Sequence, residues 1–568
     1  MPSQYEQLLG RVDALISSTS LPWLEDGAGV TRKDTVIATL VHPDAYRDES
    51  DRHRVLLIGG LTGSPDDVGA MASVLESYAT SRRLRNRIAL SVIPCANPDG
   101  LDSGETPGNG SGGNPAVGYP PEGGFFNHET DPEARYLWRY IGFMAPDYVL
   151  EVRAADGTKW ESSNAPPGIA DALDANPIED DGGLLSALGS GCPNDLGQIP
   201  GIRLNTPVSE VAKHIGALWA ILDSEHSDVE KSEARKALDS RRQRTPGEVA
   251  SKLVNHYGDT LDPVIYTQGV SMSGRLRYGS LNDSLEHYAE GIATVVEPYL
   301  TGEKPWFGDS DGGANYAGIV WCDEMYEATG DSRYRDLLLS IAGRFRGNES
   351  GQPPPPCDPD YRTEDMFFAG AILGRAYALT GDISYLDIQT AFLLEADIQA
   401  ESGLFKHCRS VPYHWGRGNG FAALGYAETL TYLPDDHPDR DNLISIHRRH
   451  LDALIAHRRP SGIFSQLLDL PGTYQELTSV CMVGYAVARG LRMGWLHESY
   501  REFVESLWNA ASERIGPDGE VVDGCTGTGA VNDQRFYIDR AAEYGRDDRT
   551  GNLALWFAVE MERLRRRV

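Results

Sequence analysis

Asp365 is a candidate for chemistry, because residues 361–368 (YRTEDMFF) place its charge directly before an apolar, helix-like run, where an apolar residue would be expected. A carboxylic acid in an enclosed site can protonate a substrate near neutral pH when burial or a second carboxylate raises its pKa. The structural alternative is that the Asp365 side chain caps the helix. The sequence therefore offers an acid and a helix cap as the two interpretations of this residue.

Three more polar segments interrupt sequence that is otherwise apolar and helical. They are residues 414–420 (HWGRGNG), residues 464–469 (FSQLLD) followed by 474–482 (YQELTSVCM), and residues 523–529 (DGCTGTG). The first combines an aromatic ring, a guanidinium and a side-chain amide, which suit stacking on a sugar and hydrogen bonding to it. The glycines between them permit close backbone approach. These residue types predict a carbohydrate site.

The elements that would position these groups are helices. Beyond residue 246, long amphipathic stretches recur with glycine or proline between them. Residues 327–334 (EATGDSRY) and 378–385 (ALTGDISY) are alike and lie about fifty residues apart, the length of one helical hairpin. In both, Gly would end one helix and Asp would cap the next. Room for about six hairpins predicts a closed double ring of helices, an (α/α)6 barrel whose loops converge on one face.

Together these segments resemble the unsaturated glucuronyl and rhamnogalacturonyl hydrolases, glycoside hydrolase families 88 and 105. In those families the run around HWGRGNG usually reads W-x-R-G-N-G-W, and here Phe421 replaces the last Trp. The resemblance covers residues 268–530. It implies hydrolysis of oligosaccharides that end in a 4,5-unsaturated uronic acid, such as unsaturated rhamnogalacturonan disaccharides, by acid-catalysed hydration of the C4=C5 double bond. This chemistry needs one acid and a positioned water, without a metal or cofactor.

The resemblance also implies roles for individual residues. Asp365 matches the family's acid and base. A second aspartate is expected one hairpin earlier, in residues 307–318 (FGDSDGGANYAG), where Asp311 is the preferred candidate and Asp309 the alternative. The residues expected to bind substrate or to hold the loops around it are His407, Arg409, His414, Trp415, Arg417, Asn419, Gln466 and Glu476.

These substrate-binding roles differ. Trp415 would stack on a sugar face, with a structural indole as the alternative. Arg417 and Asn419 would bind hydroxyls or the uronate carboxylate. His407, Arg409 and His414 would complete a cationic cluster, although a histidine is often structural. Gln466 and Glu476 would hold loops rather than contact substrate.

The N-terminal part has a different texture, in which strands alternate with helices. Residues 54–60 (RVLLIGG), 88–94 (IALSVIP) and 148–152 (YVLEV) are continuous apolar runs, typical of strands buried on both faces. Residues 68–81 and 132–144 have helical patterns. A highly charged stretch at residues 224–246 marks the boundary. The chain is therefore predicted to be multidomain, with an α/β domain at residues 1–230 and the all-α barrel at 245–568.

This α/β part resembles zinc carboxypeptidases and deacylases of the M14 type. The strand RVLLIGG runs into LTGSP, where that family has H-G-x-E, and NPDG recurs at residues 97–100. Thr62, Pro65 and Arg153 stand at the three ligand positions, and none of them supplies a zinc ligand. The neighbouring Asp66, Asp67 and His128 do not reproduce a known ligand spacing. We therefore expect a carboxypeptidase-like domain without metal that supports, caps or orients the barrel.

Composition limits the partners. The formal charge of −31 and the pI near 4.8 disfavour nucleic acid and anionic membranes, and they require local cations at any site for an anionic sugar. Residues 1–21 have no export signal, and no apolar run is long enough to span a bilayer. Seven scattered cysteines without a CxxC pair fit a reducing cytoplasm. The oligomeric state is not indicated.

Two other functions remain open. The same barrel could carry a sugar epimerase, in which paired histidines such as His407 and His414 move protons. A non-catalytic carbohydrate-binding protein is the third possibility. The discriminating observation is whether Asp365 and Arg417 face one central cavity, because a binding module need not bring an acid to the sugar.

Overall fold

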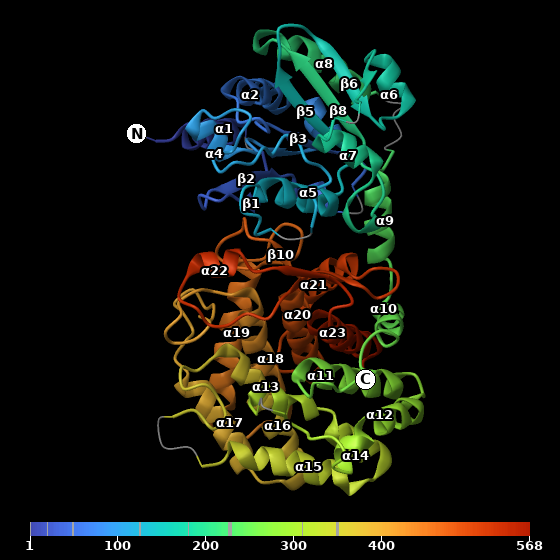
Figure 1. Cartoon of the computed structure of the whole chain (residues 1–568), viewed down its shortest axis with the longest axis vertical. Helices are drawn as coiled ribbons and strands as arrows, with labels where there is room; N and C mark the ends of the chain where they lie inside the picture. Colours follow the sequence, from blue (N-terminus) through green and yellow to red (C-terminus); the bar gives the residue numbers. More distant parts are fainter. Residues whose placement is uncertain are drawn as a thin grey trace. The chain divides into compact units, whose positions relative to one another are not determined.

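The chain forms two compact units in the computed structural model, which describes residues 2–19, 21–47, 50–123, 126–179, 181–224, 230–308, 311–347 and 352–568 (Figure 1). The first unit comprises Met1–Ser240 with Arg459–Ser461 and Leu470–Tyr474, and the second comprises Arg241–Arg458, Gly462–Asp469 and Gln475–Val568. Within the described residues, no helix combines the length and the apolar character that crossing a bilayer requires.

The first unit is built on a mixed sheet with the strand order β1-β2-β4-β3-β5-β8-β6-β7. Its central strands β4, β3, β5 and β8 run parallel, whereas β2 and β6 pair antiparallel to them. The strands are β1 Leu24–Val30, β2 Val36–Val41, β3 His53–Ile58, β4 Ile88–Ile93, β5 Tyr148–Ala154, β6 Lys159–Ser163, β7 Asn176–Pro177 and β8 Gly201–Thr206. The three predicted strands are thus confirmed as β3, β4 and β5.

Helices cover both faces of this sheet. Alternate residues of the central strands, such as Leu57 and Leu150, pack with α1, α2 and α8, while α5 and α7 contact β1 and β8 (Figure 1). The helices are α1 Gln4–Thr19, α2 Pro65–Thr80, α3 Arg82–Arg87, α4 Pro98–Ser103, α5 Pro132–Met144, α6 Pro167–Ala172, α7 Leu184–Ser190 and α8 Val211–Leu222, followed by α9 Glu233–Arg242. Because each face is covered, the strands are apolar on both sides, as their sequences predicted.

The second unit is almost entirely helical. Its helices are α10 Pro246–Leu253, α11 Tyr266–Leu281, α12 Leu285–Leu300, α13 Gly313–Tyr316, α14 Cys322–Thr329, α15 Ser332–Ala342, α16 Thr363–Thr380, α17 Ser384–Glu395, α18 Gly416–Tyr432, α19 Arg440–Ala456, α20 Leu477–Met493, α21 Arg501–Arg514, α22 Gln534–Ile538 and α23 Asp548–Arg566. Two short antiparallel strand pairs are added, β9 Phe464–Ser465 with β10 Gln475–Glu476 and β11 Val521–Cys525 with β12 Ala542–Gly545.

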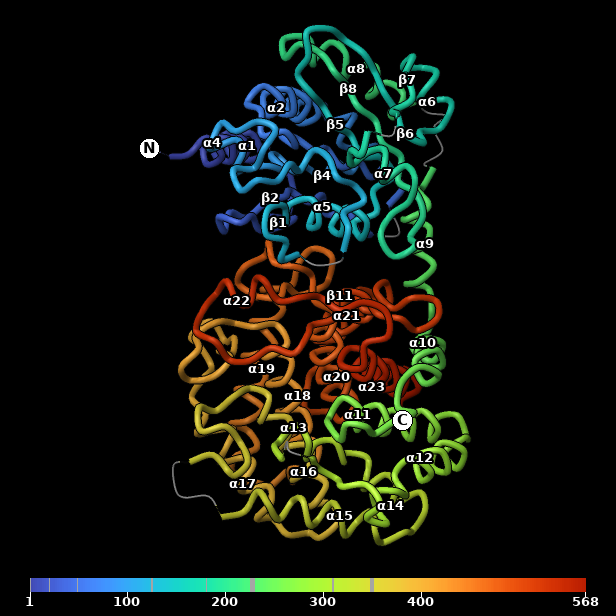
Figure 2. Tube along the Cα trace, viewed as in Figure 1, coloured from blue at the N-terminus to red at the C-terminus, as the bar shows by residue number. Residues whose placement is uncertain are grey.

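The helices form an inner and an outer layer. The inner helices pack side by side in the order α16, α18, α20, α23 and α11, and α13 with the turn after it joins α11 back to α16 (Figure 2). The inner helices α18 and α20 are buried along nearly their whole length, whereas the outer α12 and α17 bury one face. This closed double ring is the predicted (α/α)6 arrangement.

The two Thr-Gly-Asp turns form as predicted. Gly330 and Gly381 end α14 and α16 in the left-handed conformation, each with φ of 71°. The Asp331 side chain caps α15 by accepting from the Arg333 amide, and Asp382 accepts from the Ser384 amide. Glycine tolerates the positive φ that ends the helix, so each pair turns the chain from one layer of the barrel to the other.

Candidate active site

A cavity of about 500 Å³ opens where the amino ends of the inner helices meet. Its lining includes the first residues of α11, α16, α18 and α23, together with residues 356–359 and 527–528 from the connecting loops. The lining side chains that could protonate, bind or stack on a substrate are Tyr266, Glu364, Asp365, Phe368, Arg417, Phe421 and Arg549. Asp365 and Arg417, which are 52 residues apart in the sequence, therefore face one cavity.

Asp365 is buried at the wall of this cavity, in the first turn of α16. Burial raises its pKa from the ordinary value of 3.8 to about 7, and the charges of Glu364 and Asp358 act in the same direction. Its Oδ2 accepts a hydrogen bond of 2.8 Å from the Asp358 amide, which lies outside the helix. The helix-cap interpretation is therefore wrong, and the carboxyl group has the pKa of an acid that works near neutral pH.

The pKa of Asp365 makes stability depend on pH. A carboxyl group whose folded pKa lies above its unfolded value stabilises the fold at low pH, and this contribution is lost as pH rises through the folded pKa. We expect the free energy of unfolding to fall by roughly 3 kcal/mol more in the wild type than in Asp365→Asn between pH 5 and pH 8. Urea unfolding of both proteins at the two pH values measures this difference, and parallel pH dependences would contradict it.

Gly313, at the start of α13, leaves the space beside Asp365 open. A Cβ at this position would lie 3.0 Å from Asp365 Oδ1 and 3.4 Å from the Phe368 ring. No side chain of residue 313 therefore stands between the acid and the cavity.

Gly313→Ala tests the use of that space. The added methyl group would crowd Asp365 and shield it from water, so we expect a lower kcat/KM and an alkaline limb of the pH–rate profile that moves to higher pH. The same substitution at Gly312, which also lines the cavity but has open space around its Cβ position, is the matched control. Equal profiles for the two variants would show that the space beside Asp365 is not used.

Glu364 is the carboxylate next to the acid. It is held by the Nε2 of His407, 3.1 Å from its Oε1, and the His407 Nδ1 lies 2.6 Å from the Tyr537 hydroxyl. Burial alone would raise the pKa of Glu364, but His407 and Arg417 outweigh it and hold this pKa below the ordinary value. The neighbouring Glu364 and Asp365 are therefore of opposite character, an ionised carboxylate beside a carboxyl group that titrates near neutrality.

Arg417 anchors a loop at the cavity. Its two terminal nitrogens donate to the Cys525 and Thr526 carbonyls, both at 3.0 Å, and its guanidinium lies 4.8 Å from the centroid of the Trp415 ring. Trp415 is fully buried, and its ring lies 4.6 Å from that of His407. The indole thus packs beneath the site, as in the structural alternative for this residue.

Three other predicted residues lie outside the cavity lining. Arg409 is exposed, stacks on the Tyr361 ring at 3.8 Å and donates to backbone carbonyls. The His414 Nδ1 lies 2.8 Å from Asp469 Oδ2. Asn419 is buried, and its side chain bonds to the backbone of Phe405. The structure therefore places these three side chains in contacts with the protein, Arg409 at the end of α17 and the other two beside the start of α18, rather than at the cavity wall.

Gln466 and Glu476 hold the loops between β9 and α20. The Gln466 carbonyl accepts from the Gly416 amide at 2.9 Å, which ties this loop to the start of α18. The buried Glu476 carboxylate caps α20 by accepting from the Thr478 and Ser479 amides. The Glu476 contact is made by its side chain, whereas the Gln466 contact is made by its backbone, so the loop-holding role of the Gln466 side chain stays a prediction.

Asp311 is not brought to Asp365. It is exposed, Arg344 Nη1 lies 3.0 Å from each of its carboxylate oxygens, and it is not among the described residues that line the cavity. Asp309, the alternative, lies outside the described residues. The carboxylates that the described structure places near the acid are Glu364 and Asp358, whose charges both raise its pKa.

Sequence reasoning missed Glu364, Tyr266 and Arg549. The sequence shows that Glu364 directly precedes Asp365. It does not show that Glu364 pairs with His407, which is 43 residues away. Tyr266 is the first residue of α11 and Arg549 the second of α23, and nothing in their local sequence distinguishes them from other polar residues at helix starts. The only available signal was the rule that loops at one end of a helical ring converge.

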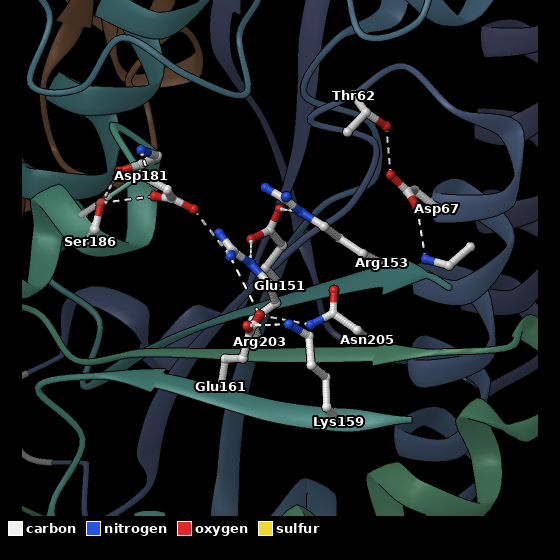
Figure 3. Close-up of polar contacts among 12 residues, drawn as sticks. Thr62, Asp67, Glu151, Arg153, Lys159, Glu161, Asp181, Ser186, Arg203 and Asn205 are labelled. Atoms are coloured by element: carbon white, nitrogen blue, oxygen red, sulfur yellow. Dashed lines mark hydrogen bonds and ion pairs between the residues drawn. The ribbon is translucent and has the colours of Figure 1, made fainter. Parts of the chain in front are cut away.

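In the first unit, an ion-pair network occupies the region where the M14 resemblance would put zinc. Glu151 is buried between two guanidinium groups, with Arg153 Nε 2.6 Å and Arg203 Nε 2.7 Å from its oxygens (Figure 3). Thr62 donates to Asp67 at 2.5 Å, and Asp67 also accepts from the Ala154 amide (Figure 3). Arg153, at the position where the resemblance expects a histidine, is thus paired with Glu151 in a network of charges.

Pro65, Asp66 and His128 do not join that network. Pro65 opens α2, Asp66 lies in its first turn, and the exposed His128 accepts from the Asp131 amide. Across the described ranges, no group of three His, Cys, Asp or Glu side chains is arranged to hold a metal ion. We expect less than stoichiometric zinc in purified protein and no effect of a chelator on thermal stability. Elemental analysis that finds one zinc per chain would overturn this expectation.

Comparison with known proteins concerns mainly the second unit. The family model of Glycosyl Hydrolase Family 88 matches residues 405–565. An unsaturated 3S-rhamnoglycuronyl hydrolase from Alteromonas sp. (strain LOR) is 26% identical over 171 residues, which are 28% of this chain and 41% of that protein. The unsaturated rhamnogalacturonyl hydrolase YesR from Bacillus subtilis (strain 168) is 26% identical over 156 residues, 27% of this chain and 43% of that protein.

A solved glycoside hydrolase of family 105 from C. acetobutylicum ATCC 824 superposes with a TM-score of 0.50 at 18% identity, covering 56% of this chain and 99% of that one. This likeness shows the (α/α)6 fold. The chain spans about two fifths of the length of the curated relatives it matches. The comparisons support a glycoside hydrolase family 88/105 domain in the C-terminal part, and Asp365 lies outside the segment that the family model matches.

Proposed function

We propose that the helical unit hydrolyses oligosaccharides whose terminal residue is a 4,5-unsaturated uronic acid. The observation that carries this proposal is the buried Asp365. Its pKa is raised to about 7, and it lines a cavity that Arg417 and Arg549 also line. An acid that is half protonated near neutral pH suits protonation of an enol ether, and the arginines suit an anionic sugar. The matched relatives, which carry names of hydrolases of unsaturated sugars, support the same chemistry.

In the proposed reaction, Asp365 donates its proton to C4 of the unsaturated ring. The electrons of the C4=C5 bond form the new C–H bond, and positive charge develops at C5, where the ring oxygen shares it. Water adds to C5 and returns a proton to the Asp365 carboxylate. The C5 hemiketal then opens to a ketone, which leaves a hemiacetal at C1 that releases the second sugar.

Glu364 and His407 support this acid rather than replace it. The negative charge of Glu364 raises the pKa of Asp365 and lies near the positive charge that develops on the sugar. His407 keeps Glu364 ionised. One titrating carboxyl group and one fixed carboxylate suit hydration of a double bond, which does not need two carboxyl groups on opposite sides of a glycosidic bond.

The epimerase alternative is not favoured by the positions of the histidines. His407 is fully buried with both ring nitrogens in contact with Tyr537 and Glu364, and His414 is paired with Asp469. Neither ring is among the described residues that line the cavity. A pair of histidines facing one sugar, which that mechanism needs, is therefore not formed by these two residues.

The test is a panel of disaccharides prepared with polysaccharide lyases, beginning with unsaturated rhamnogalacturonan disaccharide. The unsaturated uronate absorbs ultraviolet light, so hydration appears as a loss of absorbance. We expect this loss with at least one substrate, and no release of sugar from the saturated counterpart. Cleavage of the saturated disaccharide at a similar rate, or no loss of absorbance on the whole panel, would reject the proposal.

A further inference from the structure

The cavity has three arginines, and two of them are already committed to protein partners. Arg362 Nη2 lies 2.9 Å from Asp358 Oδ2. The two terminal nitrogens of Arg417 donate hydrogen bonds to the backbone carbonyls of residues 525 and 526. Each of these two guanidinium groups therefore already holds a protein partner, and only part of its five donors remains for a further carboxylate.

Arg549 is the third, and its guanidinium has no hydrogen-bond or ion-pair partner in the part of the chain that the structure describes. The residue is partly buried at the start of α23. Its backbone is fixed, because the Asp547 side chain accepts from the Arg549 and Thr550 amides at 3.2 and 3.0 Å. The start of α23 thus holds the Arg549 guanidinium at the cavity wall without a protein partner among the described residues.

The pKa of Tyr266 shows that the Arg549 guanidinium lies close enough to the Tyr266 hydroxyl to affect it. Burial raises the pKa of the Tyr266 hydroxyl, and the positive charges of Arg417 and Arg549 both oppose the rise. The Tyr266 ring packs on those of Phe368 and Phe421, at 5.1 and 5.6 Å between centroids. Arg549 therefore lies at the same aromatic wall as Arg417, and Phe368 continues that wall to the helix turn that carries Asp365.

We propose that Arg549 is the residue that binds the carboxylate of the terminal unsaturated uronate, while Arg417 positions the loop at residues 525–528. This inference rests on the proposed function. The carboxylate is attached to C5, next to the C4 that must receive the proton, so a cation facing the same cavity as Asp365 fixes the ring relative to the acid. A guanidinium suits this role because its fork matches a carboxylate with two parallel hydrogen bonds.

The test compares the wild type and one variant on two substrates. Wild type and Arg549→Gln are assayed on an unsaturated disaccharide and on its C6 methyl ester, which lacks the negative charge. We expect Arg549→Gln to lower kcat/KM for the acid by about 10- to 100-fold and to change kcat/KM for the ester little. Thermal stability should be unchanged, because the guanidinium has no partner among the described residues to lose.

Arg546→Gln is the matched control, since Arg546 lies three residues earlier, is exposed and pairs with Asp259 at the surface. It should leave both substrates unaffected. Equal losses on acid and ester in Arg549→Gln, or no loss on either, would overturn the role of Arg549 while leaving the hydrolase intact. A wild type that turns over neither substrate would instead reject the proposed function together with this inference.

Discussion

Replacing Asp365 by Asn should lower kcat on an unsaturated disaccharide by about 1000-fold, because the amide cannot donate the proton that C4 requires. The wild type should also lose activity as pH rises through about 7, since the working form of Asp365 is protonated and its pKa is raised to about 7 by burial. Initial rates of absorbance loss between pH 5 and pH 9 measure both effects.

Asp387→Asn is the control for this loss, because Asp387 is an exposed aspartate of the same unit that contacts His437. Its rate and pH profile should equal those of the wild type. Asp311→Asn adds a second comparison, since the structure pairs Asp311 with Arg344 at an exposed position. A deeper loss in Asp311→Asn than in Asp365→Asn would contradict the assignment of the acid.

Arg417→Lys should produce the second-largest effect, with kcat/KM lowered by about 100-fold and the fold destabilised by about 3 kcal/mol. A lysine keeps the charge but cannot donate to both the Cys525 and Thr526 carbonyls from the same stacked position. The loop that carries Gly527 and Thr528 into the cavity would then lose its anchor, and small displacements of site groups are costly. Disaccharide kinetics and urea unfolding measure the two effects.

Arg409→Lys separates loss of stability from loss of the site. Arg409 also stacks on an aromatic ring and donates to backbone carbonyls, but it lies outside the cavity. We expect lower stability with kcat/KM close to that of the wild type. Equal activity losses in the two lysine variants would show that the Arg417 loop contact has no special role.

The parts of the fold that local sequence determines were predictable. Buried parallel strands are apolar on both faces, and β3, β4 and β5 follow that pattern. Gly330 and Gly381 adopt the positive φ that their Thr-Gly-Asp context requires. Asp365 and Arg417 were recognised because a charged residue beside an apolar helical run is unusual, and the structure brings both to one cavity.

Side-chain partners were harder to predict, because they depend on which helix ends meet. Asn419 of the HWGRGNG motif and Arg409, which precedes that motif, were expected to bind substrate, yet their side chains bond to the protein backbone. Arg549 shows the converse, since it belongs to no motif and reaches the cavity only because α23 closes the ring against α11. Burial and partner geometry, which distinguish a ligand from a support, arise only after the ring has closed.

The most direct test of the central claim is to run the reaction in D₂O and examine the uronate product by nuclear magnetic resonance at early times. Protonation of the double bond by Asp365 predicts that the unsaturated uronate gains one deuterium at C4 as the second sugar is released. Release of the second sugar with the C4=C5 bond intact and no deuterium at C4 would show ordinary glycoside hydrolysis and would contradict the account.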